Sequence, residues 1–353
     1  MKQSNYFVLG IVAFFCFTAC NASSERVSLS QLLTNREKIT PFEVISSYNG
    51  NIYLQAGWNG FPSENGWSEV PGFGGHAIIG NHIYYLTEYE GDVVSLRLLC
   101  SNLQGGNPTE IDPMVAENAI WVVEDKIIYA KGNWGLGDTP LCTGVYWLDI
   151  HTQKTTKLLD EFDDYEQFKL LSFDKDYLYY SKGYRTVWRV DWDGSKEETF
   201  EEIQFPDNIY WVEGDDYYCV SIDYESNVTT INRFSVVNGE DKGAYLVEAC
   251  GLIAIKEGCA YYGNQKGIFS IVVNTNQTAK LSPIDPFLTS MVQTAGGTVG
   301  VFINNVLYFN ANFHLPIEDE YLEALPLSRL YSVPLAGGTM EYMGLEWLTF
   351  RFF

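Results

Sequence analysis

One strand-like motif recurs about every 45 residues along most of this chain. In each copy a turn or acidic residue precedes an apolar residue, an aromatic pair or near-pair, and then polar residues. The second aromatic residue falls at six positions: Tyr85, Tyr129, Tyr180, Tyr218, Tyr262 and Phe309. A repeat of this length built from short strands is typical of a β-propeller, in which each repeat forms one blade.

Each motif is followed by a second strand-like run and then by a tight-turn signal. The six signals are Gln104-Gly105-Gly106, His151-Thr152-Gln153, Asp193-Gly194-Ser195, Asn238-Gly239-Glu240, Asn274-Thr275-Asn276 and Ala336-Gly337-Gly338. Asp-Gly and Asn-Gly between strands indicate hairpins because these residues tolerate a positive φ. The pattern therefore predicts antiparallel meanders without long helices.

The composition supports this all-β prediction. Aromatic residues make up 15% of the chain, and Tyr alone occurs 24 times. Such residues favour half-buried pleated surfaces. We therefore expect one six-bladed β-propeller over residues 42–353. A seven-bladed ring is the alternative, because a degenerate motif occurs at 50–54; it and the terminal run 345–353 are expected to complete a shared blade or to latch the ring.

The N-terminal residues have the layout of a secretory signal. Lys2 precedes a largely apolar run, 6–17, that is too short to span a bilayer as a mature helix. The run Phe17-Thr18-Ala19-Cys20 resembles the bacterial lipoprotein signal, which implies acylation of Cys20 as the new N-terminus. We expect a signal helix at 1–19 and a polar tether at 20–41. The alternative is an ordinary cleaved signal in which Cys20 has no role.

A second resemblance concerns the blades. Tyr179-Tyr180-Ser181-Lys182, followed by the run from Val187 to Ser195 (VWRVDWDGS), resembles a blade of the YWTD propellers of low-density-lipoprotein-receptor-related proteins. It is most similar to bacterial extracytoplasmic relatives grouped as a domain of unknown function, which often occur on lipoproteins. The resemblance covers roughly residues 42–353. It implies six blades and a binding role rather than catalysis.

The charge excludes one class of partner. The formal net charge is −23. A surface this acidic repels phosphate backbones, and the chain has no basic stripe, so we expect no nucleic-acid partner. It also argues against adhesion to anionic lipid through charge. We therefore expect attachment to the cell envelope, on its extracytoplasmic side, through the N-terminal lipid alone.

The residues that commonly carry chemistry form no recognisable site. The four histidines (His76, His82, His151 and His314) form no closely spaced metal pair and lie in no nucleophile motif. Asp191-Trp192-Asp193-Gly194 has alternating carboxylates, but a hairpin turn explains it better than a calcium loop does. We therefore expect no metal, no cofactor and no catalytic residue. After Cys16 and Cys20, the remaining thiols are an odd number whose pairing stays open: Cys100, Cys142, Cys219, Cys250 and Cys259.

Three long connections are expected to share one face of the disc. If the aromatic-pair strand runs the same way in every blade, the segments 57–75, 131–143 and 310–328 emerge together. They carry the candidate binding residues Trp58, Trp67, Trp134, Phe313 and Tyr321. Aromatic loops on a rigid scaffold commonly bind ligands. The alternative is that these rings fold inward and anchor their own loops.

We therefore expect a lipid-anchored extracytoplasmic binding module for a glycan, a peptide or an envelope protein. An alternative is an extracytoplasmic enzyme that acts on a glycan with carboxylates near the propeller axis. A third is a scaffold that only docks another envelope protein. Converging carboxylates at the axis would favour the enzyme, and a broad apolar patch would favour docking.

Overall fold

The computed structural model describes residues 27–348 except 44, 50, 56–67, 71–74, 89–95, 105, 135–139, 162–167, 183–185, 201–208, 224, 250, 265, 284–299 and 315–325. At some strand positions, Trp134 and Phe313 among them, it describes the backbone alone. Apart from one helix, the regular structure within these residues is strand.

Each of the six repeat modules folds into four antiparallel strands in chain order. Strand β8 serves two modules, since its first half pairs with β7 and its second half with β9. The first two modules comprise β5 (His76–Ile79), β6 (His82–Glu88), β7 (Leu96–Asn102), β8 (Thr109–Val123), β9 (Lys126–Trp134), β10 (Pro140–Asp149) and β11 (Lys154–Leu159). The third comprises β12 (Phe168–Phe173), β13 (Tyr177–Lys182), β14 (Val187–Asp191) and β15 (Glu197–Thr199).

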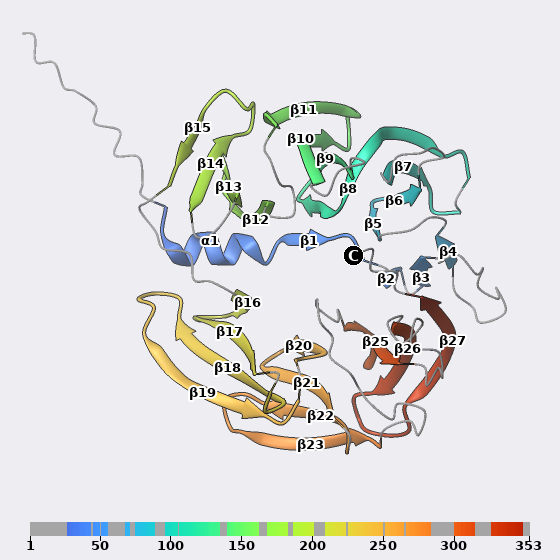
Figure 1. The fold of residues 1–353 in the computed structure, drawn as a ribbon, viewed down its shortest axis with the longest axis vertical. Helices are drawn as coiled ribbons and strands as arrows, with labels where there is room; N and C mark the ends of the chain where they lie inside the picture. Colours follow the sequence, from blue (N-terminus) through green and yellow to red (C-terminus); the bar gives the residue numbers. More distant parts are fainter. Residues whose placement is uncertain are drawn as a thin grey trace, which may run out of the picture.

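The last three modules repeat the same arrangement. Their strands are β16 (Ile209–Glu213), β17 (Asp216–Asp223), β18 (Val228–Ser235), β19 (Asp241–Val247), β20 (Ala254–Lys256), β21 (Cys259–Asn264), β22 (Gly267–Val272), β23 (Gln277–Ser282), β24 (Val301–Ile303), β25 (Val306–His314), β26 (Pro326–Pro334) and β27 (Glu341–Leu348). In every module the first strand lies near the centre of a disc and the last at its rim (Figure 1). The protein is therefore an all-β propeller, as the repeat predicts.

The segment around Ile52 forms a sheet of its own. Strands β2 (Ile45–Tyr48) and β3 (Asn51–Gln55) are antiparallel, and β4 (Ser68–Val70) pairs with β3 in parallel. The C-terminal run is not a lone strand that joins them. Its first residues belong to β27, which pairs with β26. The expected shared blade is therefore wrong for the described residues: each terminal piece pairs within its own sheet.

The aromatic pairs of the repeat fill the space between neighbouring sheets. Each of these side chains is at most 7% exposed: Tyr84, Tyr85, Tyr129, Tyr179, Tyr180, Tyr217, Tyr218, Tyr261, Tyr262 and Phe309. Three buried hydroxyls donate to carboxylates, from Tyr129 to Asp112 (3.0 Å), from Tyr179 to Asp174 (2.7 Å) and from Tyr180 to Glu197. Since buried polar groups need partners, the repeat supplies both core volume and hydrogen bonds.

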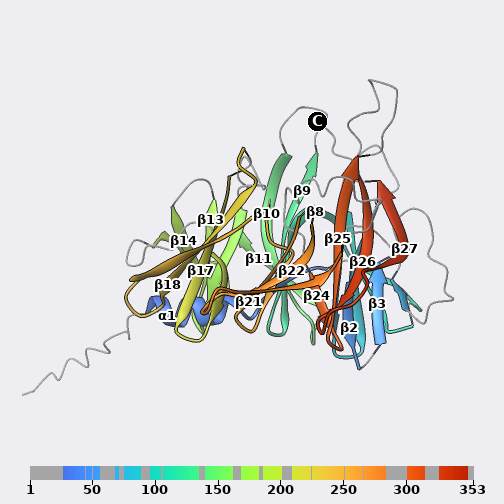
Figure 2. The same cartoon turned by 90° about the horizontal axis from the view of Figure 1, so that it is seen from below.

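The predicted tight turns join the third and fourth strands of their modules. Gly194, Gly239 and Gly337 have positive φ values of 74°, 69° and 88°. Such angles favour glycine because it has no Cβ to clash with the following carbonyl. These turns lie on the same side of the disc as α1, which we call the lower face (Figure 2).

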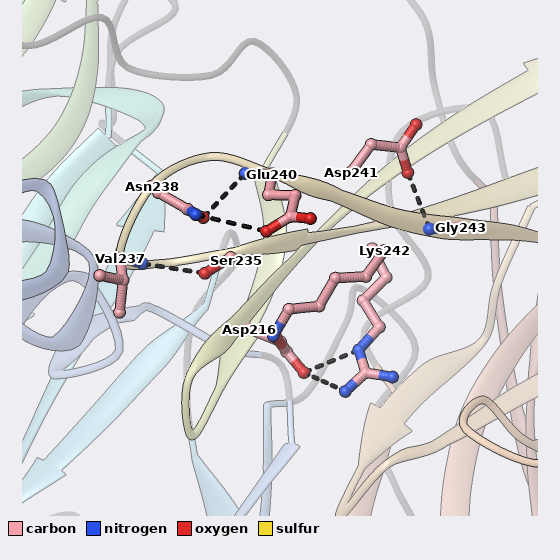
Figure 3. Close-up of polar contacts among 9 residues, drawn as sticks. Asp216, Ser235, Val237, Asn238, Glu240, Asp241, Lys242 and Gly243 are labelled. Atoms are coloured by element: carbon pink, nitrogen blue, oxygen red, sulfur yellow. Dashed lines mark hydrogen bonds and ion pairs between the residues drawn. The ribbon is translucent and has the colours of Figure 1, made fainter.

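The turn between β18 and β19 illustrates the lower face. Asn238 accepts a hydrogen bond from the backbone of Glu240, and Val237 donates to Ser235 (Figure 3). Nearby, the buried Asp216 carboxylate accepts hydrogen bonds from Arg233 and Lys242. The two cations compensate for the burial of this charge.

The expected polar tether is folded over much of its length. Helix α1 (Leu29–Arg36) begins with the Ser28 side chain accepting a hydrogen bond from the backbone of Gln31, and β1 (Ile39–Pro41) pairs with β8. Leu32 and Leu33 are fully buried. The tether prediction therefore fails for residues 29–41, because two adjacent leucines in a polar stretch provide apolar contacts on both sides of a short helix.

Candidate functional site

The two faces of the disc carry different features. The second strand of each module leads from the lower face to the opposite one, which we call the upper face. Helix α1 lies along the lower face, whereas β9, β10 and β25 extend far toward the upper face (Figure 2). These hairpin strands contain nine or ten residues each. The hairpins β9–β10 and β25–β26 therefore project on the side away from α1.

Two of the predicted binding residues belong to these hairpins. Trp134 is the last residue of β9, and its Cα pairs with that of Pro140. Phe313 is the second-last residue of β25, and its Cα pairs with that of Leu327 in β26. The segments expected as loops at 131–143 and 310–328 are thus partly strand, because their ends continue the hairpin pairing. The backbone of both residues lies near the ends of hairpins that project on the upper face.

The remaining predicted binding residues, Trp58, Trp67 and Tyr321, lie outside the described residues, as does Cys20. The expectation that they form a binding rim with Trp134 and Phe313 stays a prediction. Strand β4 lies within the expected loop 57–75. That connection leads directly into His76, at the start of β5.

A polar cluster lies where β1, β2 and β5 meet, near the centre of the disc (Figure 1). We define this axial cluster as Glu43, Ser46 and His76. Glu43 and His76 exchange two backbone hydrogen bonds of 3.0 and 2.8 Å. Their side chains therefore leave the same side of the backbone pair. Ser46 Oγ and His76 Nε2 lie 2.7 Å apart.

Burial dominates the electrostatics of the axial cluster. His76 is 1% exposed, and burial lowers its pKa to about 4, so the imidazole is neutral at pH 7. Burial also raises the pKa of Glu43 to about 7. The buried Nδ1 atom of His76 has no hydrogen-bond partner among the described residues. At pH 7 the axial cluster thus combines a neutral imidazole, one nitrogen of which has no hydrogen-bond partner among the described residues, with a carboxyl group that holds its proton more tightly than usual.

No local sequence pattern predicts the axial cluster. Glu43 and His76 are far apart in the chain, and His76 belongs to no motif. The close approach requires Gly75, whose φ is +111°, since an added Cβ there would lie 3.0 Å from the backbone of Phe42. Only the fold brings these residues together.

The other candidates have structural roles. Asp191 and Asp193 accept hydrogen bonds from Ser195 and Lys196 within their own turn. This agrees with the hairpin interpretation rather than the calcium loop. Within the described ranges, no three His, Cys, Asp or Glu side chains are grouped as metal ligands.

Three of the cysteines are described with their side chains. Cys100, Cys219 and Cys259 carry thiols rather than disulfides, and each is half-buried. The structure does not describe the side chain of Cys142, and Cys250 lies outside the described residues. None of these three thiols is fully buried.

Within the described residues the one helix, α1, has eight residues and is too short to cross a membrane.

No protein-family model and no curated protein sequence matches this chain. Among solved structures it is similar to the β-propeller domain of the trilobed protease from Pyrococcus furiosus, at 13% identity and a TM-score of 0.38, covering 77% of this chain and 95% of that one. It is also similar to TolB from Acinetobacter baumannii, at 14% identity and a TM-score of 0.35, covering 75% of this chain and 67% of that one.

A third similar structure is an uncharacterized protein from Listeria monocytogenes, at 6% identity and a TM-score of 0.41, with 76% of this chain and 80% of that chain covered. The chain also matches the tricorn protease and a prolyl endopeptidase, but it spans only 26% and 38% of their lengths. Because these TM-scores are low, the class of this protein is defined by its own structure. The strand order within each sheet and the ring of sheets make it a β-propeller.

Proposed function

We propose that this protein is a lipid-anchored extracytoplasmic β-propeller that binds a glycan, a peptide or an envelope protein at its upper face. The observation that carries the proposal is that helix α1 and the projecting hairpins lie on opposite faces of the disc. The chain enters the disc through α1 on the lower face, and the hairpins β9–β10 and β25–β26 project from the upper face (Figure 2). An anchor at Cys20 would therefore leave the projecting hairpins accessible to a partner.

Anchoring is supported by the lipoprotein-like run that ends at Cys20 and by the apolar segment before it. Two acyl chains make membrane attachment stable. The resemblance of the blade at Tyr179–Ser195 to YWTD propellers supports a binding role. Trp134 and Phe313 add aromatic residues at the hairpin ends, a residue type that predominates in binding sites.

The glycan-acting enzyme is less well supported. The axial cluster contains a carboxyl group, Glu43, whose raised pKa suits a general acid. However, glycoside hydrolysis commonly uses two carboxyl groups, and the axial cluster as defined supplies one. We therefore retain binding as the proposed function.

The anchoring part is tested by Cys20→Ser in the full chain. We expect the wild-type protein in the membrane fraction, and the variant either released or left unprocessed. A variant that is correctly cleaved and remains in the membrane fraction at the wild-type level contradicts lipidation.

The binding part is tested with Trp134→Ala and Phe313→Ala. We expect both to weaken retention of the host's envelope glycans or proteins at least tenfold, with little change in thermal stability. The matched control is Tyr342→Ala, which removes a 40% exposed aromatic side chain from β27. If Trp134→Ala and Phe313→Ala bind as well as Tyr342→Ala and the wild-type protein do, the proposal of an upper-face site is contradicted. A loss of about 3 kcal/mol of stability would instead show that the rings are core.

A further inference from the structure

The axial cluster combines a hydroxyl, an imidazole and a carboxyl group, which are contributed by Ser46, His76 and Glu43. Ser46 lies in β2 and His76 begins β5, in two different sheets near the centre of the disc (Figure 1). Binding at the upper face makes no use of these three groups. Together they are the side-chain types of a serine nucleophile, its base and the acid that orients the base.

The hydroxyl and the imidazole are placed as nucleophile and base. Ser46 Oγ lies 2.7 Å from His76 Nε2, within the range over which a serine passes its proton to a histidine. His76 is buried and unprotonated at pH 7, because burial lowers its pKa to about 4. Ser46 is only half-buried. The nucleophile is therefore more accessible than its base.

The other ring nitrogen lacks the partner that this role requires. When Nε2 accepts the Ser46 proton, the proton of the neutral ring is on Nδ1, and Nδ1 is buried without a hydrogen-bond partner among the described residues. Glu43 pairs with His76 through two backbone hydrogen bonds, so the two side chains leave the same side of the pair with Cβ atoms about 5 Å apart. A rotation of the Glu43 side chain supplies the missing acceptor. A carboxylate at Nδ1 also makes Nε2 more basic.

The strand that carries Ser46 also offers a donor for an oxyanion. Tyr48 and Asn51 flank a two-residue turn, so their backbones form a hydrogen-bonded pair. The next pair, which contains Ser47, is then a non-hydrogen-bonded one, and the N–H of Ser47 points away from β3. It faces the edge of β2 that has no partner in the described sheet. The N–H of the residue after the nucleophile is one of the oxyanion donors in α/β-hydrolases.

We propose that the axial cluster is an esterase centre, in which Ser46 is the nucleophile, His76 is the general base and Glu43 is a positioning residue that acts through His76. The substrate class is a carboxylic ester. An ester suits this centre better than an amide, because an alkoxide leaves with less help from a proton donor than an amine does. This activity is separate from binding at the upper face and does not depend on acylation of Cys20.

The reaction needs water as its only co-reactant. Ser46 Oγ attacks the ester carbonyl carbon while its proton passes to His76 Nε2, and the N–H of Ser47 stabilises the oxyanion. The carbon–oxygen bond to the alcohol then breaks, and the alcohol leaves with the proton from Nε2. A water molecule attacks the acyl group on Ser46, giving its proton to Nε2. The acid is released, and that proton returns to Ser46 Oγ.

The direct test is covalent labelling of the full chain with a biotinylated fluorophosphonate. This reagent phosphonylates a serine hydroxyl that a base activates, with loss of fluoride, and peptide mass spectrometry locates the adduct. We expect the adduct on Ser46. Ser226 is the internal control, because its exposed hydroxyl donates to the Asp223 carboxylate at 2.6 Å rather than to an imidazole.

Two variants test the roles of the imidazole and the carboxyl group. His76→Gln should lower the labelling rate of Ser46 about 100-fold or more, because the base is removed. Glu43→Gln should lower kcat for p-nitrophenyl acetate about tenfold or more and leave KM within about twofold, because it alters the base and not the substrate contacts. A fall in melting temperature without this change in kcat would contradict the positioning role of Glu43.

Three further outcomes would overturn the proposal. The first is the absence of an adduct on Ser46, or equal labelling of Ser46 and Ser226. The second is labelling of Ser46 at the wild-type rate in folded His76→Gln, which would mean that the imidazole is not the base. The third is undiminished hydrolysis of p-nitrophenyl acetate by Ser46→Ala, which would mean that the activity lies elsewhere. Ser46→Ala removes one half-buried hydroxyl and provides this test even if His76→Gln does not fold.

Discussion

At the scale of single residues, burial gives Glu43 and His76 opposite responses to pH. Burial raises the pKa of Glu43 from 4.5 to about 7, so the folded protein holds this proton more tightly than the unfolded chain. Its contribution to stability therefore decreases as the pH rises from 4.5 to 7. Burial lowers the pKa of His76 from 6.5 to about 4, so its contribution decreases as the pH falls through that range.

We therefore expect these contributions to offset each other between pH 4.5 and 6.5 in the wild-type protein. Glu43→Gln should lose stability on acidification over this range, and His76→Gln should lose stability on alkalinisation, each by about 3 kcal/mol at most. Urea unfolding at several pH values measures both slopes. The quantity compared is the slope of the unfolding free energy against pH in each variant, minus that of the wild type, so that the contributions of the other titrating groups cancel. Equal slopes for all three proteins would contradict the raised pKa of Glu43 and the lowered pKa of His76.

At the scale of elements, two equivalent turns allow the cost of backbone strain to be distinguished from the cost of overpacking. Gly194 and Gly239 occupy equivalent turns with φ values of 74° and 69°. An alanine Cβ at position 194 would lie 2.5 Å from the carbonyl oxygen of Lys157 in β11, whereas the nearest atom at position 239 is 4.0 Å away. Gly194→Ala must therefore displace a strand of the neighbouring module.

We expect Gly239→Ala to cost about 1 kcal/mol through the left-handed backbone alone. Gly194→Ala should cost about 3 kcal/mol because overpacking against β11 is added. Denaturant unfolding of the two variants measures the difference. Equal losses would mean that strain dominates and that the turn does not pack on β11.

The same elements show which parts of the fold were predictable. The buried pair Tyr179-Tyr180 and the Asn238-Gly239 turn follow from local patterns, since strand periodicity and turn chemistry are short-range. Helix α1 does not follow from local patterns, because its burial depends on two sheets distant in sequence. The axial cluster does not follow from them either, because the Glu43–His76 pairing exists only after the ring has formed. Trp134 is expected in the loop 131–143, whereas the structure has it at the end of β9, because the hairpin pairing continues well beyond the aromatic pair.

At the scale of the whole molecule, the net charge of −23 opposes compaction through mutual repulsion. The repulsion acts over about 30 Å at 0.01 M salt and about 8 Å at 0.15 M. We therefore expect the melting temperature at pH 8 to rise by several degrees when sodium chloride is increased from about 0.01 to about 0.15 M. Near the sequence pI of about 4.4, where the net charge vanishes, the same increase should have little effect. Potassium chloride serves as the control for ion-specific binding. A melting temperature independent of salt at pH 8 would mean that local pairs, such as Asp216 with Arg233 and Lys242, already neutralise the repulsion that matters for folding.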